Sequence, residues 1–280
     1  MRGILTLICL SLFSSCEDIK YVITEGDSKL VVEGWIEEGD VARVLVTRSI
    51  PMTVPIDSLN LVRYVIRSAM VIVSDGTVCD TLRLMSARNY LPPFLYVGEK
   101  IIGKTGGEYA LTVKYLSHTL TAETYIPPTV PITDARYERQ NPADTIGNLV
   151  VEFTDPGDRQ YYYQIATRLE GRDRIFVPCL YGNLNSRNFV SPDVSIQVTR
   201  GITVFPRTSF ESHFNDGDRI AVRLRTMPKE GFDFWNSWQN VMVNAHNAIF
   251  PANSSLKGNI TGGIGIWCGY GQSVVGIEAR

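Results

Sequence analysis

Short runs of β-branched residues, separated by turn signals, fill the first half of the chain and limit what it can fold into. Residues 30–36, 41–50 and 69–74 are rich in valine and isoleucine, which favour strands. The Asp-Gly pair at 75–76 is typical of a tight hairpin turn. Residues 109–115 alternate apolar and polar side chains, as a half-buried strand does. Several such strands, with no helical periodicity between them, predict a β-sandwich.

A proline-rich segment at 127–131 separates this strand set from a second one. Proline lacks the amide hydrogen that the interior of a sheet needs, so the segment is expected to be a linker. We therefore expect a mainly β protein of two tandem immunoglobulin-like or transthyretin-like β-sandwich domains, at 30–126 and 132–280. In the second domain the sequence predicts strands at 132–139, 149–153, 161–169, 202–205 and 219–227.

Residues 231–246 break the β pattern. Apolar residues recur there at spacings of three and four, and Pro251 bars a longer helix. The apolar stripe is either a sugar-stacking platform or a core face, and we favour a short amphipathic helix packed on the second sandwich. If the protein has a ligand site, exposed aromatic side chains are its candidate contacts, namely Trp235, Trp238 and Trp267.

The N-terminus carries the features of an export signal. A basic start and an apolar run at 4–13 precede small residues that lead directly into Cys16. The run is shorter than the roughly 20 apolar residues that a spanning helix needs. Cysteine at this position resembles the lipobox of bacterial lipoproteins, in which the thiol is acylated after cleavage. We expect a signal peptide at 1–15, a lipid on Cys16 and a tether at 16–29.

The residues after the cysteine bear on the compartment. Glu17 and Asp18 resemble the surface-export signal of lipoproteins from Gram-negative gut anaerobes, so we expect a lipid anchor in the outer membrane and a protein facing the cell exterior. Three triplets resemble the O-glycosylation sequon of extracytoplasmic proteins in those bacteria. Their candidate acceptors are Ser58, Thr81 and Thr145.

Composition and cysteine usage exclude several classes of protein. The 27 basic and 29 acidic residues nearly balance and form no basic block, so nucleic acid is not an expected partner. Hydrophobic residues make up 44% of the chain, which is too many for a disordered protein. Cys79, Cys179 and Cys268 remain after processing. We expect either a disulfide between Cys179 and Cys268 or three buried free thiols.

The chain lacks a recognisable catalytic or metal-binding motif. Residues 98–105 match the phosphate-loop pattern, but an alternating strand follows where that loop needs a helix. The Asn-Asp-Gly-Asp cluster at 215–218 lacks the further oxygen ligands of a calcium loop. We therefore expect no enzyme, no cofactor, no metal and no bound nucleotide. His118, His213 and His246 have no metal-ligand spacing, although a serine triad built from distant segments stays open.

Several segments, taken in order, carry a family resemblance: LVVEGWI, SAMVIVSDG, GEYALTVKY, TAETYIPP, LVVEFTDPGDRQYYYQIA, FDFWNSW and GNITGGIGIWCGYG. They resemble the bacterial lipoprotein family known as domain of unknown function 4249. Genes of this family often lie beside TonB-dependent receptors. The resemblance therefore implies a non-catalytic binding or accessory subunit of a TonB-dependent nutrient-import receptor. The alternative is a structural adhesin or fimbria-like surface protein, which tandem sandwiches on a lipid anchor also resemble.

Overall fold

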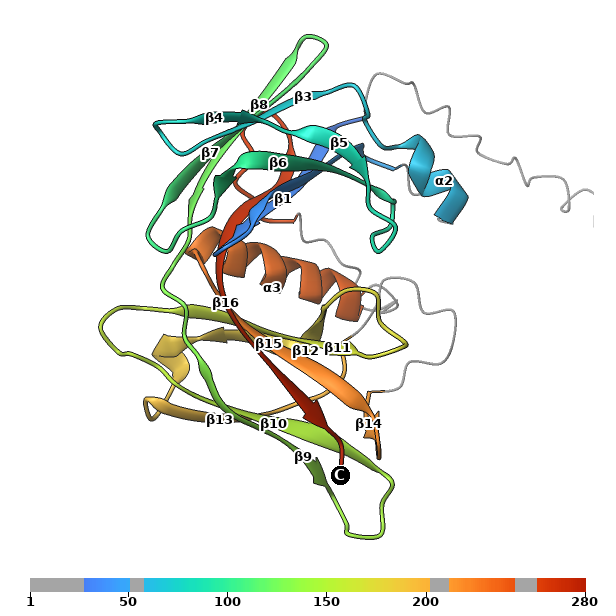
Figure 1. Cartoon of the computed structure of the whole chain (residues 1–280), viewed down its shortest axis with the longest axis vertical. Coiled ribbons are helices and arrows are strands. Elements are labelled where there is room, and N and C mark those ends of the chain that lie inside the picture. Colours follow the sequence, from blue (N-terminus) through green and yellow to red (C-terminus); the bar gives the residue numbers. More distant parts are fainter. Residues whose placement is uncertain (1–27, 51–57, 202–211, 245–255) are drawn as a thin grey trace, which may run out of the picture.

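The computed structural model describes residues 28–50, 58–201, 212–244 and 256–280, and it is mainly β. Figure 1 shows two β-rich halves along the long axis, with helix α3 (Lys229–Asn244) between them. Two shorter helical segments are α2 (Ser58–Arg63) and η2 (Ser186–Asn188). The mainly β prediction is therefore confirmed. No helix in these ranges is long and apolar enough to cross a membrane.

The strands form three sheets. In chain order they are β1 (Leu30–Glu37), β2 (Val41–Arg48), β3 (Met70–Ser74), β4 (Cys79–Thr81), β5 (Arg83–Ser86), β6 (Phe94–Ile102), β7 (Glu108–Tyr115), β8 (His118–Tyr125), β9 (Ile132–Arg139), β10 (Ile146–Thr154), β11 (Tyr162–Leu169), β12 (Val177–Asn185), β13 (Asp193–Val198), β14 (Phe214–Asn215), β15 (Arg219–Met227) and β16 (Ile264–Glu278). The largest sheet has the order β12-β11-β15-β16-β1-β2-β6-β5. The others are β4-β3-β7-β8, and β13-β10-β14 with β9 also paired to β10.

Local sequence patterns produce the elements of the first half. Residues alternate between buried and less buried positions along β2 and β7, as the alternating sequence predicts. The turn between β3 and β4 contains Gly76 at φ 86°, and the Asp75 carboxylate accepts a hydrogen bond from the Val78 amide at 2.7 Å. The predicted hairpin is therefore confirmed. Residues 98–102 end strand β6 and β7 follows, so no helix is present to hold phosphate.

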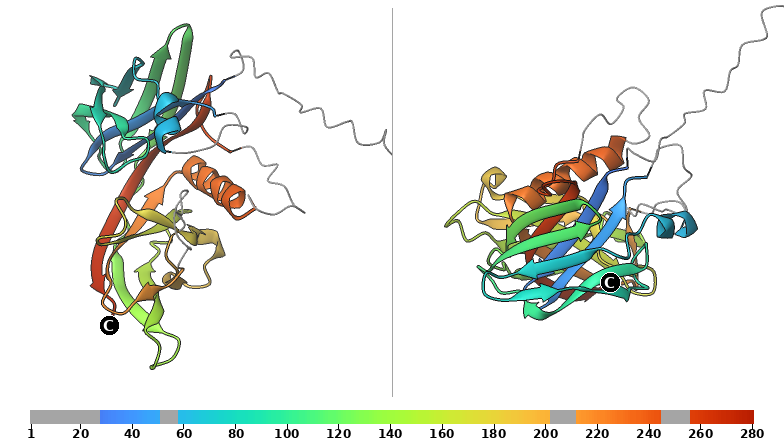
Figure 2. Two further views of the ribbon diagram at one scale, coloured as in Figure 1. Left: turned by 90° about the vertical axis from the view of Figure 1, so that its right-hand side faces the viewer. Right: turned by 90° about the horizontal axis from the view of Figure 1, so that it is seen from above.

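Strand β16 joins the two halves. Its first part pairs in parallel with β1, from Val31↔Ile264 to Glu37↔Tyr270. Its second part pairs antiparallel with β15, from Thr226↔Gly271 to Arg219↔Glu278. Figure 2 shows this long strand running past both halves. The sequence-based division placed all of 132–280 in the second sandwich, whereas the structure places 264–270 in the sheet of the first.

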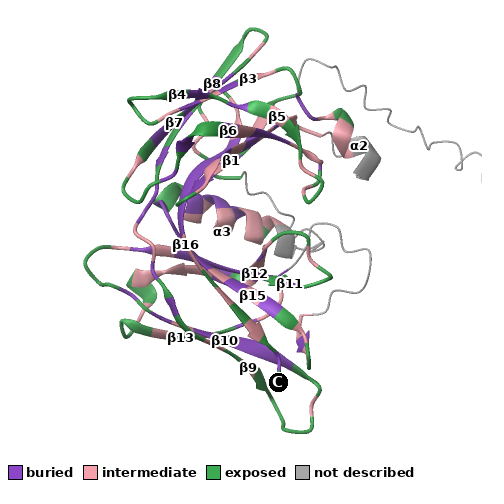
Figure 3. Cartoon of the chain, viewed as in Figure 1, coloured by how far each residue is buried: buried purple, intermediate pink, exposed green. Residues whose placement is uncertain are grey.

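Two main hydrophobic clusters fill the halves. The N-terminal cluster combines residues of β1, β2, β3, β7 and β8, and it includes the fully buried Trp267. The C-terminal cluster lies between β10 and the β11–β15 part of the large sheet, where Phe153 and Tyr163 have ring centroids 4.9 Å apart. A third cluster packs α3 on β16. Figure 3 shows the buried residues that line both halves.

The predicted disulfide between Cys179 and Cys268 is wrong. Both are free, buried thiols, because Cys179 belongs to the C-terminal cluster and Cys268 to the cluster beneath α3. Cys79 is also free but exposed, so the alternative of buried free thiols holds for two of the three. Burial raises the pKa of Cys179 and of Cys268 to about 12, which keeps both protonated at neutral pH.

Candidate functional site

The large sheet bends around α3, and we call the side that carries this helix the concave face. Figure 2 shows α3 within the bend, with β16 along its outer side. The face is formed by side chains of β1, β11, β15 and β16 that point away from the two sandwich cores. They are Trp35, Glu37, Gln164, Arg223, Arg225, Tyr270 and Gln272.

Helix α3 is fixed to this face by aromatic packing. Phe234 is buried against β16, and Gly231 allows close approach because a Cβ there would collide with the Cys268 sulfur. The Trp235 indole Nε1 donates a hydrogen bond to the Tyr270 hydroxyl at 2.9 Å. Trp238 packs edge-on against Trp235 at 5.6 Å between ring centroids. The predicted helix therefore docks by its aromatic stripe and leaves Trp238 half-buried at the edge.

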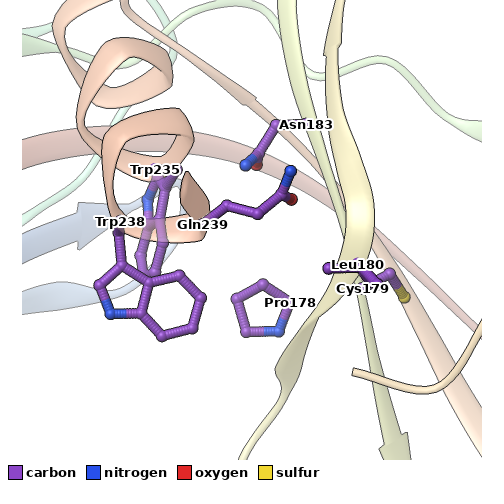
Figure 4. Close-up of a pocket in the computed structure, with 7 residues that line it drawn as sticks. All are labelled: Pro178, Cys179, Leu180, Asn183, Trp235, Trp238 and Gln239. Carbon is purple, nitrogen blue, oxygen red and sulfur yellow. The ribbon is translucent and has the colours of Figure 1, made fainter. Parts of the chain in front are cut away.

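A shallow pocket, open to solvent, lies between α3 and β12. Figure 4 shows the Trp238 indole beside the Pro178 ring, with the side-chain amides of Asn183 and Gln239 farther along the wall. Such a combination of flat apolar surfaces and a few amide groups is typical of sites for small ring-bearing ligands. The complete lining is Pro178, Cys179, Leu180, Asn183, Trp235, Trp238 and Gln239.

Tyr181 adds a strained backbone position next to the pocket. Its φ is 58°, in the left-handed region that non-glycine residues rarely adopt, and its side chain is exposed. The Tyr181 amide donates to Gln239 Oε1 at 2.9 Å, so a residue of α3 holds this conformation of β12. Strain of this kind persists where the surrounding structure enforces it, and it often accompanies binding sites.

A buried ionic network lies on the same face. Glu37 of β1 is 7% exposed and accepts a short hydrogen bond from Arg225 of β15. Arg223 Nη1 lies 3.5 Å from the same carboxylate, and Gln272 Nε2 donates to it at 3.2 Å. Burial alone would raise the pKa of Glu37, but attraction from Arg225 and Arg223 and the Arg225 hydrogen bond together hold it below its ordinary value.

Strand register connects the network to the pocket. Asn183, Gln164 and Arg225 are successive ladder partners on β12, β11 and β15. Pro178, Ala166 and Arg223 form the neighbouring row. Gln164 is fully buried and its Nε2 donates to Asn183 at 3.2 Å, but its Oε1 has no hydrogen-bond partner. The pocket and the ionic network are therefore parts of one continuous surface.

The three tryptophans that the sequence proposed as ligand contacts lie in two different places. Trp235 and Trp238 both line the pocket. Trp267 does not, since it is fully buried in the N-terminal cluster and its Nε1 donates to the Tyr109 carbonyl at 2.9 Å. Its prediction as an exposed contact is therefore wrong. The register of β16, in which Trp267 pairs with Gly34, turns the indole into the core.

The other predicted positions fall in different places. Thr81 and Thr145 are exposed, as a modified hydroxyl requires. Ser58 begins α2, but its side chain lies outside the described residues. The same is true of the predicted signal peptide, of Cys16, of the tether up to residue 27, of the strand predicted at 202–205 and of the end of the predicted helix. Asn215 and Gly217 form a tight turn, in which the Asn215 amide donates to Asp218 Oδ2 at 2.8 Å. Among the described residues no group of three or more His, Cys, Asp or Glu side chains could hold a metal ion.

Sequence reasoning missed the ionic network. Arg223 and Arg225 alternate with the core residues Val222 and Leu224, which is the pattern of a strand with one solvent-exposed face. The pattern does not reveal that this arginine face is buried. The partners of this face come from distant segments: Glu37, which contacts Arg225, lies 188 residues away from it in sequence.

Fold and site together define a β-rich protein with a preformed aromatic and arginine-lined face. Sequence comparison then gives the family. The profile described as Domain of unknown function (DUF4249) matches residues 17–274, which is nearly the whole chain. The protein belongs to this family. Comparison with curated proteins gives no significant match.

Proposed function

We propose that the protein is a non-catalytic binding protein whose ligand-contacting surface is the pocket on the concave face. One observation carries this proposal. Trp235 and Trp238 of α3 meet Pro178 and Asn183 of β12 in a pocket whose walls are already fixed by hydrogen bonds. Aromatic surfaces held in place before binding lose little conformational entropy when a ligand arrives. The arrangement therefore suits reversible capture of a small ligand.

The proposal extends to location and partner. A lipid on Cys16 would anchor the protein in the outer membrane, facing the cell exterior, as an accessory subunit of a TonB-dependent nutrient-import receptor. The support is the basic, apolar and small-residue pattern before Cys16, together with membership of a family whose genes often neighbour such receptors. In the same proposal, each half is an immunoglobulin-like or transthyretin-like sandwich, supported by the hydrophobic cluster between its two sheets.

The partner is tested by a pull-down of the tagged, natively lipidated protein from outer membranes in mild detergent. Mass spectrometry is expected to identify one β-barrel receptor in a stoichiometric amount. Recovery of the protein alone, or as a ladder of itself, would contradict the receptor proposal and favour the adhesin or fimbria-like alternative. A C16A variant is the control for the anchor, because it is expected to leave the membrane fraction.

The site is tested separately, with the ligand that the receptor imports. Trp238→Ala removes one pocket wall and is expected to weaken ligand binding at least about tenfold, because truncation of a central aromatic contact commonly costs 2 kcal/mol or more. Tyr125→Ala is the matched control, since Tyr125 is a half-exposed aromatic residue on β8 and does not line the pocket. Equal binding by both variants would exclude the pocket.

A further inference from the structure

In the ionic network, Arg223 has weaker contacts with the Glu37 carboxylate than Arg225 has. Its separation of 3.5 Å from Glu37 exceeds the 2.7–2.9 Å of a good charge-assisted hydrogen bond, whereas Arg225 contacts the same oxygen closely. The Arg223 Nε is buried and has no hydrogen-bond partner, and the same is true of the Arg225 Nε. A buried donor without a partner is unfavourable, so an acceptor that reached it would stabilise the site.

The ion pairs of the network contain one more guanidinium than carboxylate. Two guanidinium groups, Arg223 and Arg225, converge on the single carboxylate of Glu37. Arg43 and Asp40 nearby are 2.6 Å apart and cancel each other. Burial, followed by repulsion from Arg225, lowers the pKa of Arg223 to about 9. An uncompensated buried cation is unfavourable, so the site is suited to a monoanion.

Two further groups complete this electrostatic environment. Glu33 points from β1 on the same side as Glu37, is exposed and forms no ion pair with a described side chain; desolvation raises its pKa, although attraction from Arg225 lowers it. Burial raises the pKa of Tyr270, so this neighbour of Arg225 stays neutral at pH 7. Neither group therefore supplies a buried negative charge beside Arg223 at neutral pH.

Strand register places Arg223 two strands away from Pro178, a residue that lines the pocket. To reach the Phe176 ring, with its centroid 4.3 Å away, the Arg223 side chain extends from β15 across β11. Phe176 is two residues before Pro178, which lines the pocket beside Trp238. Since strand neighbours are about 4.8 Å apart, the row from Arg223 through Ala166 to Pro178 spans about 10 Å between its outer backbones. A ligand of one ring with a short acidic substituent matches this span.

We propose that the concave face binds a ring-bearing monocarboxylate, with its ring against Trp238 and Pro178 and its carboxylate on Arg223. This inference rests on the proposed binding function and names the class of ligand. Arginine suits the role because its planar fork of donors matches a carboxylate. Aromatic acids and sugar acids share this chemistry.

Calorimetric titration of the full-length protein with two matched pairs of probes tests the proposal. Benzoate and benzamide carry the same aromatic ring with and without a negative charge. Glucuronate and glucose carry the same type of sugar ring with and without a negative charge. One carboxylate is expected to bind at least about tenfold more tightly than its neutral match, because charge-assisted hydrogen bonds are the strong ones. A preference for benzoate would identify an aromatic acid, and a preference for glucuronate would identify a sugar acid.

Variants locate the charge contact. Arg223→Gln is expected to remove the preference for the carboxylate and to leave the neutral probe unchanged. Arg219→Gln is the matched control, because Arg219 points from the same strand but is exposed and pairs with Glu170. If Arg223→Gln does not fold, Arg223→Lys keeps the charge without the fork and is expected to weaken carboxylate binding severalfold.

Several outcomes would overturn the inference. They are equal binding of charged and neutral probes, unchanged carboxylate binding by the folded Arg223 variants, tighter binding of inorganic phosphate than of either carboxylate, and no carboxylate binding by the wild type. None of these results changes the receptor pull-down. A stoichiometric receptor without a carboxylate preference would therefore reject this ligand class alone, and recovery without a receptor would reject the proposed function.

Discussion

Replacement of Glu37 by glutamine tests whether the buried network holds the two halves together. Glutamine preserves the size of the side chain but removes the carboxylate that contacts both Arg223 and Arg225. At an effective dielectric constant of about 20, the attraction across 3.5 Å between Glu37 and Arg223 is about 5 kcal/mol before desolvation. Breaking a buried pair by removing one partner costs about 3–5 kcal/mol, so both arguments give the same magnitude.

The assay is urea denaturation of the full-length protein at pH 7, with thermal unfolding as a second measurement. A loss of about 3 kcal/mol in the free energy of unfolding would lower Tm by about 6–12 °C for a chain of this size. Glu33→Gln is the matched control, since Glu33 lies on the same face of β1 but forms no ion pair with a described residue. Desolvation raises its pKa, so its charge adds no stability, and its replacement is expected to cost less than about 0.5 kcal/mol. Equal stability of the two variants would show that the Glu37 carboxylate does not stabilise the fold.

Three further predictions follow from burial and charge. Because the pKa of Glu37 is lowered in the folded state, its stabilisation is present above its ordinary value of 4.5 and is lost as pH falls below it, so the wild type and Glu37→Gln should converge in stability in acid. Trp267→Ala should cost about 3–5 kcal/mol in denaturant unfolding, since it opens a cavity in the N-terminal cluster, and a loss below about 1 kcal/mol would contradict its core role. Iodoacetamide should modify Cys79 in the native protein and spare Cys179 and Cys268, as mass spectrometry would detect, whereas equal labelling would contradict their burial.

Local features of the fold could be predicted from the sequence because they depend on neighbouring residues. The Asp-Gly hairpin at 75–76, the alternating strand β7 and the helix around Trp235 each follow from spacing within a short segment. The pocket could be predicted in part for the same reason. Its helical wall of tryptophans was visible as an aromatic stripe, whereas the facing Pro178 belongs to a strand that carried no clear pattern.

The remaining features depend on contacts between distant segments. Only the tertiary structure gives the parallel pairing of β16 with β1, in which Gly265 approaches the Val32 carbonyl too closely for a Cβ. That pairing determines that Trp267 is core rather than ligand contact. It also places Glu37 beside Arg225, so the ionic network and the separation of Cys179 from Cys268 were equally inaccessible to periodicity.

Strand β16 unites the two halves into one body and thereby preforms the concave face. Differential scanning calorimetry of the full-length protein can test this, with Trp267→Ala in the N-terminal cluster and Leu224→Ala in the C-terminal cluster. If β16 makes the halves one body, the protein shows one cooperative transition, and both substitutions shift it to lower temperature. Two separate transitions, each moved by only one of the substitutions, would contradict it.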